Sequence, residues 1–432
     1  MSTSLAVKAR LPQLHYAWVI VAAAFVTAVI TAGTLGISGV LLIPLQKSFG
    51  WQSSDISSAF GFRLALFGLL GPFSAALMNR FGVRRMVTIA LLIILAGLVS
   101  TIFVRTFWQF FISWGLLTGV GTGLTAMVFN ATVATRWFVK RRGLVTGLLS
   151  ASNATGQLIF LPALASVTEI YGWRTTIIIA CIAISIAVAV ILLFMRDYPS
   201  DVGLGPYGET DPPEDKPNAA APPGSLWSLL TTPIVVLKEA GQTPIFWILF
   251  ATFYICGAST SGLIQTHFVS LCGDYGILPV EAASVLAMMG VFDLVGTTGS
   301  GWLSDRFDNR WLLFWYYGLR GLALLYLPFT TFNLYGLSLF AVFYGLDWIA
   351  TVPPTLRLTI ERFGRVKANI VFGWIFAGHQ LGAASAAFGA GLSRTVLGSY
   401  LPAFFSSGAI CIIAAALVIT IQSNQQGEAK LS

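Results

Sequence analysis

Six ionisable side chains lie inside long apolar stretches of this 432-residue chain: Arg63, His267, Asp293, Arg320, Asp347 and His379. A charge in a nonpolar environment costs at least about 2.5–3.5 kcal/mol on membrane-insertion scales, so each one needs a partner or a function. Two arginines balance two aspartates, which favours internal pairing. A buried carboxyl group can also take up and release a proton, and histidine titrates near neutral pH. The set therefore suits ion pairing, proton transfer or anion binding.

The composition indicates which elements position these side chains. Apolar residues make up 56% of the chain, charged residues only 10%, and the mean hydropathy is +0.80. Because soluble proteins carry about 25% charged residues, the chain reads as a polytopic membrane protein. This composition excludes a disordered chain, a disulfide-stapled secreted domain and a nucleic-acid binder. The four cysteines have no CxxC spacing, so neither a metal site nor a disulfide framework is indicated.

Apolar runs long enough to cross a bilayer predict an all-α protein with twelve membrane spans. The predicted spans are 16–40, 54–78, 86–104, 107–133, 144–167, 174–195, 244–270, 281–304, 311–331, 334–356, 370–392 and 398–421. Residues 196–243 interrupt the apolar pattern with a stretch rich in Pro, Gly and acidic residues, which predicts a cytoplasmic linker. The chain then divides into a six-helix bundle at 1–195, the linker, and a second bundle at 244–432.

The positions of lysine and arginine predict the orientation of these spans. Of the 25 basic residues, two lie within spans and four in predicted outer loops, Lys47, Arg105, Arg174 and Arg394. The remaining 19 lie in inner loops and termini. Because cytoplasmic loops concentrate Lys and Arg, we expect both termini in the cytoplasm and an even number of spans.

The two predicted bundles carry matching loop motifs. ALMNRFGVRR at 76–85 follows the second span, and GWLSDRFDNR at 301–310 follows the eighth. RWFVKRRG at 136–143 and RLTIERFG at 357–364 follow the fourth and tenth spans. Matching motifs at matching positions indicate two copies of one six-helix unit.

These motifs resemble those of the major facilitator superfamily. Gly301-x-Leu303-x-Asp305-Arg306-Phe307 is similar to its inner-loop motif, and the first copy differs in having Ala75 and Asn79. The stretch 136–174 further resembles the branch of bacterial monocarboxylate porters and oxalate/formate-type antiporters. This resemblance rests on Trp137-Phe138, Arg142-Gly143, Pro162 and Gly172-Trp173-Arg174, and on Gly203-Leu204 and Pro206-Tyr207-Gly208 at the start of the linker.

The resemblance implies a transporter in which spans one, four, seven and ten line a central cavity. It places Asp293 at the position of an aspartate used in proton-linked carboxylate transport. Those relatives carry an arginine one turn later, where this chain has Thr297, and a lysine that aligns with His379. A dianion such as oxalate is therefore disfavoured, whereas a monoanion, or a substrate carried with a proton, remains open.

Further candidates for substrate or proton coupling accompany Asp293 and His379: Arg63, Asn130, Gln157, His267 and Asp347. Arg63 must meet an aspartate, backbone carbonyls or a substrate anion. His379 either binds a carboxylate or stays neutral on a backbone carbonyl, and for His267 an interfacial position is favoured. Asp347 also forms a candidate structural ion pair with Arg320. Other polar residues suit a cavity lining: Thr31, Thr34, Ser38, Thr122, Asn153, Ser259, Thr260, Gln265 and Gln380.

The inner-loop motif predicts a latch at the inner gate. Its residues are Asn79, Arg80, Gly82, Arg84, Gly301, Asp305 and Arg306. We expect Asp305, near a helix N-terminus, to make charge-assisted bonds with following basic residues. For the arginines, the alternative is simple positive-inside topology.

Together these features predict a secondary transporter of the bacterial inner membrane, working by alternating access. The favoured activity is proton-coupled transport of a small, monocarboxylate-like organic anion. The alternative is a proton-coupled exporter of drugs or metabolites, although the fifth span lacks a Gly-Pro step. A sensor or membrane enzyme is disfavoured, because no nucleophile–base pair, Walker motif or metal cluster occurs. We expect no cofactor beyond the proton gradient, a monomer in the lipid bilayer, and no nucleic-acid partner.

Overall fold

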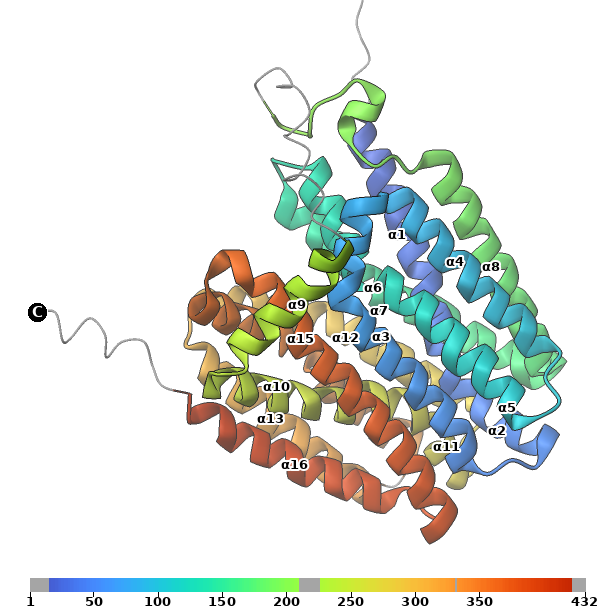
Figure 1. The fold of residues 1–432 in the computed structure, drawn as a ribbon. Helices are drawn as coiled ribbons and strands as arrows, with labels where there is room; N and C mark the ends of the chain where they lie inside the picture. The colour runs from blue at the N-terminus through green and yellow to red at the C-terminus, as the bar shows by residue number, and fades with distance from the viewer. Residues whose placement is uncertain (1–14, 210–225, 331, 422–432) are drawn as a thin grey trace, which may run out of the picture.

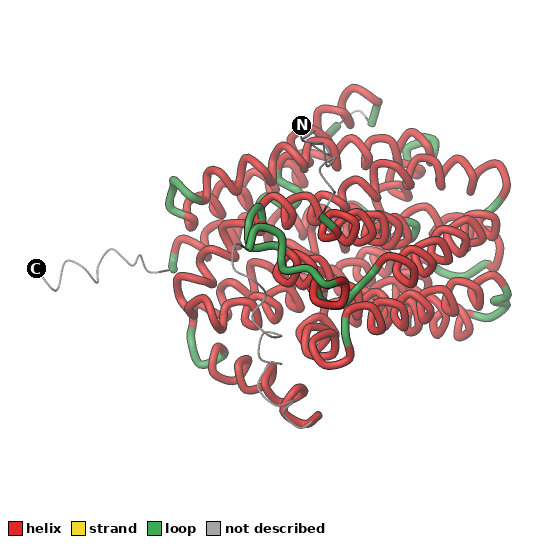
Figure 2. The backbone as a smooth tube through the Cα atoms, turned by 90° about the horizontal axis from the view of Figure 1, so that it is seen from above, coloured by secondary structure: helices red, strands yellow, loops and turns green. Residues whose placement is uncertain are grey.

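The computed structural model describes residues 15–209, 226–330 and 332–421, apart from some side chains within the helices. Helices form nearly all of this part of the chain, and short loops join them (Figure 2). The two groups of helices that the sequence predicts as bundles lie on either side of the molecule in Figure 1.

The first group precedes the predicted linker. Its helices, in chain order, are α1 (Tyr16–Gly36), α2 (Ser38–Phe49), α3 (Ser53–Phe81), α4 (Val83–Ile102), α5 (Phe107–Phe110), η1 (Phe111–Leu117), α6 (Thr118–Trp137), α7 (Arg142–Tyr171) and α8 (Trp173–Phe194). A short 3-10 turn, η2 (Pro199–Val202), follows.

The second group follows the predicted linker, which itself contains helix α9 (Leu226–Ala240). Its helices are α10 (Pro244–Gly257), η3 (Ala258–Ile264), α11 (Gln265–Asp274), α12 (Pro279–Ser304), α13 (Asn309–Tyr326), η4 (Leu327–Phe329), α14 (Leu334–Leu346), α15 (Val352–Leu397) and α16 (Leu401–Ile419). Helix α15 joins two helices across Gly364, whose backbone is not helical at φ 74° and ψ 156°.

Nine helical stretches of the described chain are long and apolar enough to cross a membrane. Three other predicted spans correspond to α5–α6, to α7, and to α14 with the start of α15. The first two of these stretches contain many small and polar residues, and the third is interrupted at 347–351. The number of twelve crossings therefore stays a prediction.

Each of the four spans predicted to line a cavity departs from regular α-helix. The first is divided at Ile37 into α1 and α2, although Ile37 itself keeps helical φ and ψ angles. The π-helical segments η1 and η3 lie within the fourth and seventh, and non-helical turns occupy 347–351 in the tenth. Because π-segments and broken helices expose backbone groups, they occur in membranes where they are buried in protein or face a cavity.

Long helix pairs join the two groups. Helix α3 runs along α15, and α7 runs along α12. At one end of the molecule, the amide of Ser54 donates to Thr395 Oγ1 at 3.1 Å, and Ser53 Oγ lies 3.3 Å from the Tyr400 hydroxyl. These contacts hold the two groups together at that end, which lies opposite the end that carries α9.

The described parts of the predicted linker, residues 196–209 and 226–243, are more structured than their composition suggests. Tyr207 pairs with the chain after α6, donating its amide to the Trp137 carbonyl at 2.8 Å. Its ring packs against Trp18 and Phe138. Helix α9 packs on both α3 and α15 (Figure 1). The low hydrophobicity of 196–224 did not reveal these docking points, because they depend on a few aromatic and apolar residues.

Candidate functional site

A cavity of about 150 Å³ lies between the two groups of helices. Its lining comes from all four interrupted spans, together with α3 and α15. The polar side chains of the lining are Thr27, Thr31, Ser38, Arg63, Thr122, Thr125, Asn130, Thr260, Ser261, Gln265, Thr266, Thr351, His379 and Gln380. Among the described residues of this lining, Arg63 is the one side chain charged at neutral pH, and none is a carboxylate.

Arg63 projects from α3 and is 3% exposed. Its guanidinium lies 5.3 Å from the centroid of the Trp114 ring, which belongs to η1. Such a cation–π contact stabilises a cation while leaving its N–H donors to other acceptors. Helix α6 crosses close to this point, because a Cβ on Gly119 would lie 3.1 Å from the Arg63 Cα. The sequence proposed an aspartate, carbonyls or a substrate as partners, and the structure adds an aromatic ring.

His379 lies on α15 between two aromatic rings of the same wall. Its ring stacks on Phe376 at 5.6 Å and is tilted against Phe253 at 5.1 Å. Within the described part of the chain, Nδ1 has no hydrogen-bond partner. Because the residue also lines the cavity, its imidazole is a candidate contact for a bound solute.

Asn130 is one of three polar residues of α6 in the described lining, with Thr122 and Thr125. Its amide nitrogen donates to the Leu149 carbonyl of α7 at 3.0 Å, which leaves its oxygen as an acceptor. Of the other polar residues predicted for the lining, Thr31, Ser38, Thr122, Thr260, Gln265 and Gln380 belong to it. Thr34 and Ser259 are buried outside it.

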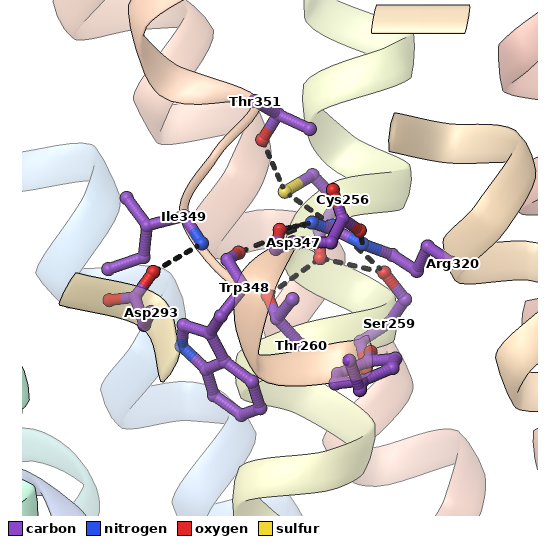
Figure 3. A network of polar contacts seen from close by, with 10 residues as sticks. Cys256, Ser259, Thr260, Asp293, Arg320, Asp347, Trp348, Ile349 and Thr351 are labelled. Atoms are coloured by element: carbon purple, nitrogen blue, oxygen red, sulfur yellow. Dashed lines mark hydrogen bonds and ion pairs between the residues drawn. The ribbon is translucent and has the colours of Figure 1, made fainter. Parts of the chain in front are cut away.

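Arg320 and Asp347, predicted as an ion pair, lie behind the cavity wall. Arg320 Nε donates to Asp347 Oδ2 at 2.6 Å, and both side chains are almost completely buried. The guanidinium also donates to the backbone carbonyls of Asp347 and Trp348, at 2.5 and 3.2 Å, and to Cys256 Sγ at 2.9 Å. Figure 3 shows this network around the interrupted tenth span. Arg320 thus neutralises a buried carboxylate and also supplies hydrogen bonds to backbone carbonyls that the broken helix leaves without partners.

Asp293 approaches the same segment from the opposite side (Figure 3). Its Oδ1 accepts from the Ile349 amide at 3.0 Å and from Thr297 Oγ1 at 2.7 Å. The position that carries arginine in the resembling transporters here supplies a hydroxyl donor. Ile349 lines the cavity, so Asp293 is separated from it by one backbone unit.

Three of the predicted site and lining residues either lie away from the cavity or have side chains outside the described residues. His267 is fully buried on α11 and its Nε2 lies 2.7 Å from the Ala387 carbonyl, so it does not line the cavity. Gln157 and Asn153 belong to α7, but their side chains lie outside the described residues.

The inner-loop motif lies at the end of the molecule that carries α9. Asp305 caps the C-terminus of α12, not an N-terminus as expected, and it binds Arg357 of α15 at 2.5 Å. Arg306 instead donates to the Trp302 carbonyl and lies over that ring at 4.1 Å. A Cβ on Gly301 would meet no other atom within 4 Å. The second copy of the motif therefore joins the eighth and tenth spans of one group.

The first copy of the motif uses a different acid. The Arg84 amide donates to Asp197 Oδ1 at 2.9 Å, and its guanidinium binds the Leu192 carbonyl. Gly82 has φ 87°, and a Cβ there would lie 2.6 Å from the Asp197 carboxylate. Arg80 lies over the Phe81 ring, and the Asn79 side chain lies outside the described residues. An acid from the start of the linker thus caps this loop.

Sequence reasoning missed the backbone of 347–351 as part of the site. The available signal was Pro353-Pro354, because proline lacks the N–H that continues a helix and is tolerated only in its first turn. The aromatic partners Trp114, Phe253 and Phe376 were also missed, because their contacts join helices that are distant in sequence.

The helical fold and the cavity between the two groups of helices are those of a membrane transporter. The chain belongs to the Major Facilitator Superfamily, whose model matches residues 23–387. It is a multi-pass membrane protein of that family, as the resemblance of its motifs implied.

Several known proteins are similar along most of their length. Monocarboxylate transporter 13 of Rattus norvegicus is 25% identical over 418 residues, covering 95% of this chain and 90% of that protein. The uncharacterized MFS-type transporter YcxA of Bacillus subtilis (strain 168) is 22% identical over 386 residues, covering 88% of each. The crystal structure of a D-xylose-proton symporter has a TM-score of 0.70 at 15% identity, covering 95% of this chain and 99% of that one. Its low identity shows likeness of fold alone.

Proposed function

We propose that this protein carries a small, monocarboxylate-like organic anion across the membrane together with a proton. The observation that carries the proposal is the charge of the cavity. Its described lining holds a buried arginine, Arg63, and no carboxylate. A cation in a medium of low dielectric constant attracts an anion more strongly than in water. The same lining disfavours a cationic drug as the substrate.

The size of the cavity supports a small substrate. Pockets for drug-sized ligands enclose about 300–1,000 Å³, whereas this one encloses about 150 Å³. Apolar rings from Phe60, Phe67, Phe253 and Phe376 share the lining with hydroxyl and amide groups. A short carboxylate with a small apolar body matches this combination.

The relatives support the same substrate class. The animal proteins that are similar over nearly the whole chain are named as monocarboxylate transporters. In the proposed mechanism, Arg63 on α3 binds the carboxylate of the substrate. His379 on α15 and Asn130 on α6 contribute further polar contacts.

Asp293 is the proposed proton acceptor. It is 4% exposed, lies beside the cavity wall, and is bound by neutral donors. Protonation removes a buried negative charge, which favours movement of the loaded carrier. The two helical groups would then rock about the central site, opening it alternately to each side.

We further propose a monomeric carrier in the cell membrane with both termini in the cytoplasm. Both groups of helices from one chain line the cavity, so a single chain supplies a complete site. The excess of basic residues in the predicted inner loops supports this orientation.

The test is uptake of radiolabelled lactate and a panel of other short monocarboxylates into proteoliposomes. We expect uptake driven by an acid exterior, abolished by a protonophore, and absent from protein-free vesicles. Arg63→Gln should greatly reduce uptake at substrate concentrations below the wild-type KM, whereas Arg105→Gln, at an exposed loop position, should not. Failure of every monocarboxylate to enter under a pH gradient would overturn the substrate class.

A further inference from the structure

The tenth span is interrupted at the depth of the cavity. Helix α14 ends at Leu346, the chain makes turns through 347–351, and α15 begins at Val352. Backbone N–H and C=O groups in such a break lose their helical partners, and no water replaces them within a bilayer. Pro353 and Pro354 maintain the interruption, because neither can donate a hydrogen bond to the preceding turn.

Side chains from two other helices bind the freed backbone groups. Arg320 of α13 donates to the carbonyls of Asp347 and Trp348. Asp293 of α12 accepts from the amide of Ile349. The segment is therefore held by a cation on its carbonyl side and by a carboxyl group on its amide side (Figure 3).

This segment is also part of the cavity wall. Trp348, Ile349 and Thr351 all line the cavity. Thr351 Oγ1 lies 3.3 Å from Cys256 Sγ on α10, and the Cys256 thiol lies 2.9 Å from Arg320. A shift of the segment would therefore move three residues of the cavity lining together.

We propose that the hydrogen bond from the Ile349 amide to Asp293 transmits the protonation state of Asp293 to the cavity wall. The inference rests on the proposed proton coupling and names its structural route. An ionised Asp293 holds the amide with a charge-assisted bond. When a proton binds Oδ2, Oδ1 becomes the oxygen of a neutral acid and a weaker acceptor. The wall segment is then released to adopt its substrate-dependent position.

The charges around Asp293 are consistent with this role. Arg320 acts on it from α13, and Asp347 lies near it at the end of α14. Thr297 donates from one turn along α12 itself. The described side chains of α7, α11 and α15, which also pack on α12, place no charge against it. Because Arg320 is already bound by Asp347, Asp293 is free to change its charge without breaking that pair.

Hydrogen–deuterium exchange of the peptide that covers 344–352 tests the proposal directly. We would compare wild type, Asp293→Asn and Thr297→Val in detergent from pH 5 to pH 8, with rates corrected for intrinsic exchange. We expect exchange in wild type to become faster toward acid pH. In Asp293→Asn, which mimics the protonated form, it should be roughly five-fold faster at neutral pH and independent of pH, because charge-assisted bonds are about twice as strong as neutral ones.

Thr297→Val and one further variant, Asp347→Asn, separate the alternatives. Thr297→Val keeps the carboxyl group and should retain the pH dependence. Asp347→Asn should retain it too. A flat wild-type profile would overturn the proposal, and so would a pH dependence lost in Asp347→Asn but kept in Asp293→Asn. The wild-type profile remains decisive even if Asp293→Asn does not fold.

The same preparations assayed for uptake distinguish this proposal from the proposed function. Proton-driven uptake that depends on Asp293, with no change in exchange at 344–352, would keep the function and reject the route. A change in exchange without proton-driven uptake of any monocarboxylate would keep the structural link and reject the function.

Discussion

Arg320 and Asp347 are joined twice, once through side chains and once through the backbone. Arg320 Nε binds Asp347 Oδ2 at 2.6 Å, and Nη2 binds the Asp347 carbonyl at 2.5 Å. The pair thus ties α13 to the point where the tenth span leaves its helix. The pair neutralises two buried charges, and it also supplies a hydrogen bond to the backbone where the helix of the tenth span is interrupted.

Loss of one partner of this pair should be strongly destabilising. Asp347→Ala leaves a buried cation uncompensated, so we expect a loss of about 3–5 kcal/mol in the free energy of unfolding. Glu239→Gln breaks the exposed pair with Lys367 and should cost at most about 1 kcal/mol. Thermal unfolding of both variants in the same detergent gives the comparison. Equal losses in the two variants would contradict the proposed role.

Arg63 should control substrate affinity more than stability. Removing a charge-assisted bond costs about 1.5–3 kcal/mol, so Arg63→Gln should raise the KM for a monocarboxylate roughly 10- to 100-fold. Arg63→Lys keeps the charge but loses the planar guanidinium over Trp114, and should give an intermediate effect. Initial uptake rates over a range of concentrations provide the measurement. An unchanged KM in Arg63→Gln would remove this residue from the binding site.

The two buried histidines should behave differently. His379 lines the cavity, so His379→Asn should raise the KM with little change in unfolding temperature. His267 joins α11 to α15 through the Ala387 carbonyl, so His267→Asn should lower the unfolding temperature and leave the KM nearly unchanged. The reverse pattern would show that His267, not His379, contacts the substrate.

Two glycines permit the closest approach between α10 and α15. A Cβ on Gly257 would collide with the His379 carbonyl, and one on Gly382 with the Tyr254 carbonyl. Because overpacking typically costs about 1–3 kcal/mol, Gly257→Ala should be destabilising by at least that much. Gly389, also on α15, has open space, so Gly389→Ala should be neutral or slightly stabilising. Unfolding temperatures of the two variants decide the matter.

Asp308, an exposed residue, should contribute to the folding stability in a way that depends on pH. It caps α13 and binds the Arg310 guanidinium, and that hydrogen bonding lowers the pKa of the Asp308 carboxyl group. A lowered folded-state pKa gives stability at neutral pH that is lost as the pH falls through the acidic range. The difference in unfolding temperature between wild type and Asp308→Asn should therefore shrink toward pH 3. A difference that grows toward acid pH would contradict this assignment.

Much of the fold could be predicted, because the bilayer imposes its length on apolar runs. Most predicted spans lie within a few residues of the observed helices, as 174–195 does with Trp173–Phe194. The contacts of the inner-loop motif could not be predicted. Asp305 binds Arg357 instead of the neighbouring basic residues. Because the two residues are far apart in the sequence, no local pattern predicts that they meet.

The site was predictable by residue type but not by arrangement. Scarcity of charge singled out Arg63, Asp293 and His379, since each is costly in a membrane. Periodicity assumes continuous helices, however, and so it could not show that 347–351 leaves the helix. The role of Asp293 as a ligand of a backbone amide follows from that break alone.

Helix α9 has a consequence for the speed of transport. Trp374 donates to the Pro233 carbonyl at 2.8 Å, and Lys367 binds Glu239 at 2.5 Å, so α9 is fastened to α15. Its packing on α3 reaches the other group of helices. If those groups rock, the contact with α3 must form and break once in every cycle. Residues that never meet the substrate thus set part of the barrier between the two orientations, and changes there should alter turnover while leaving affinity intact.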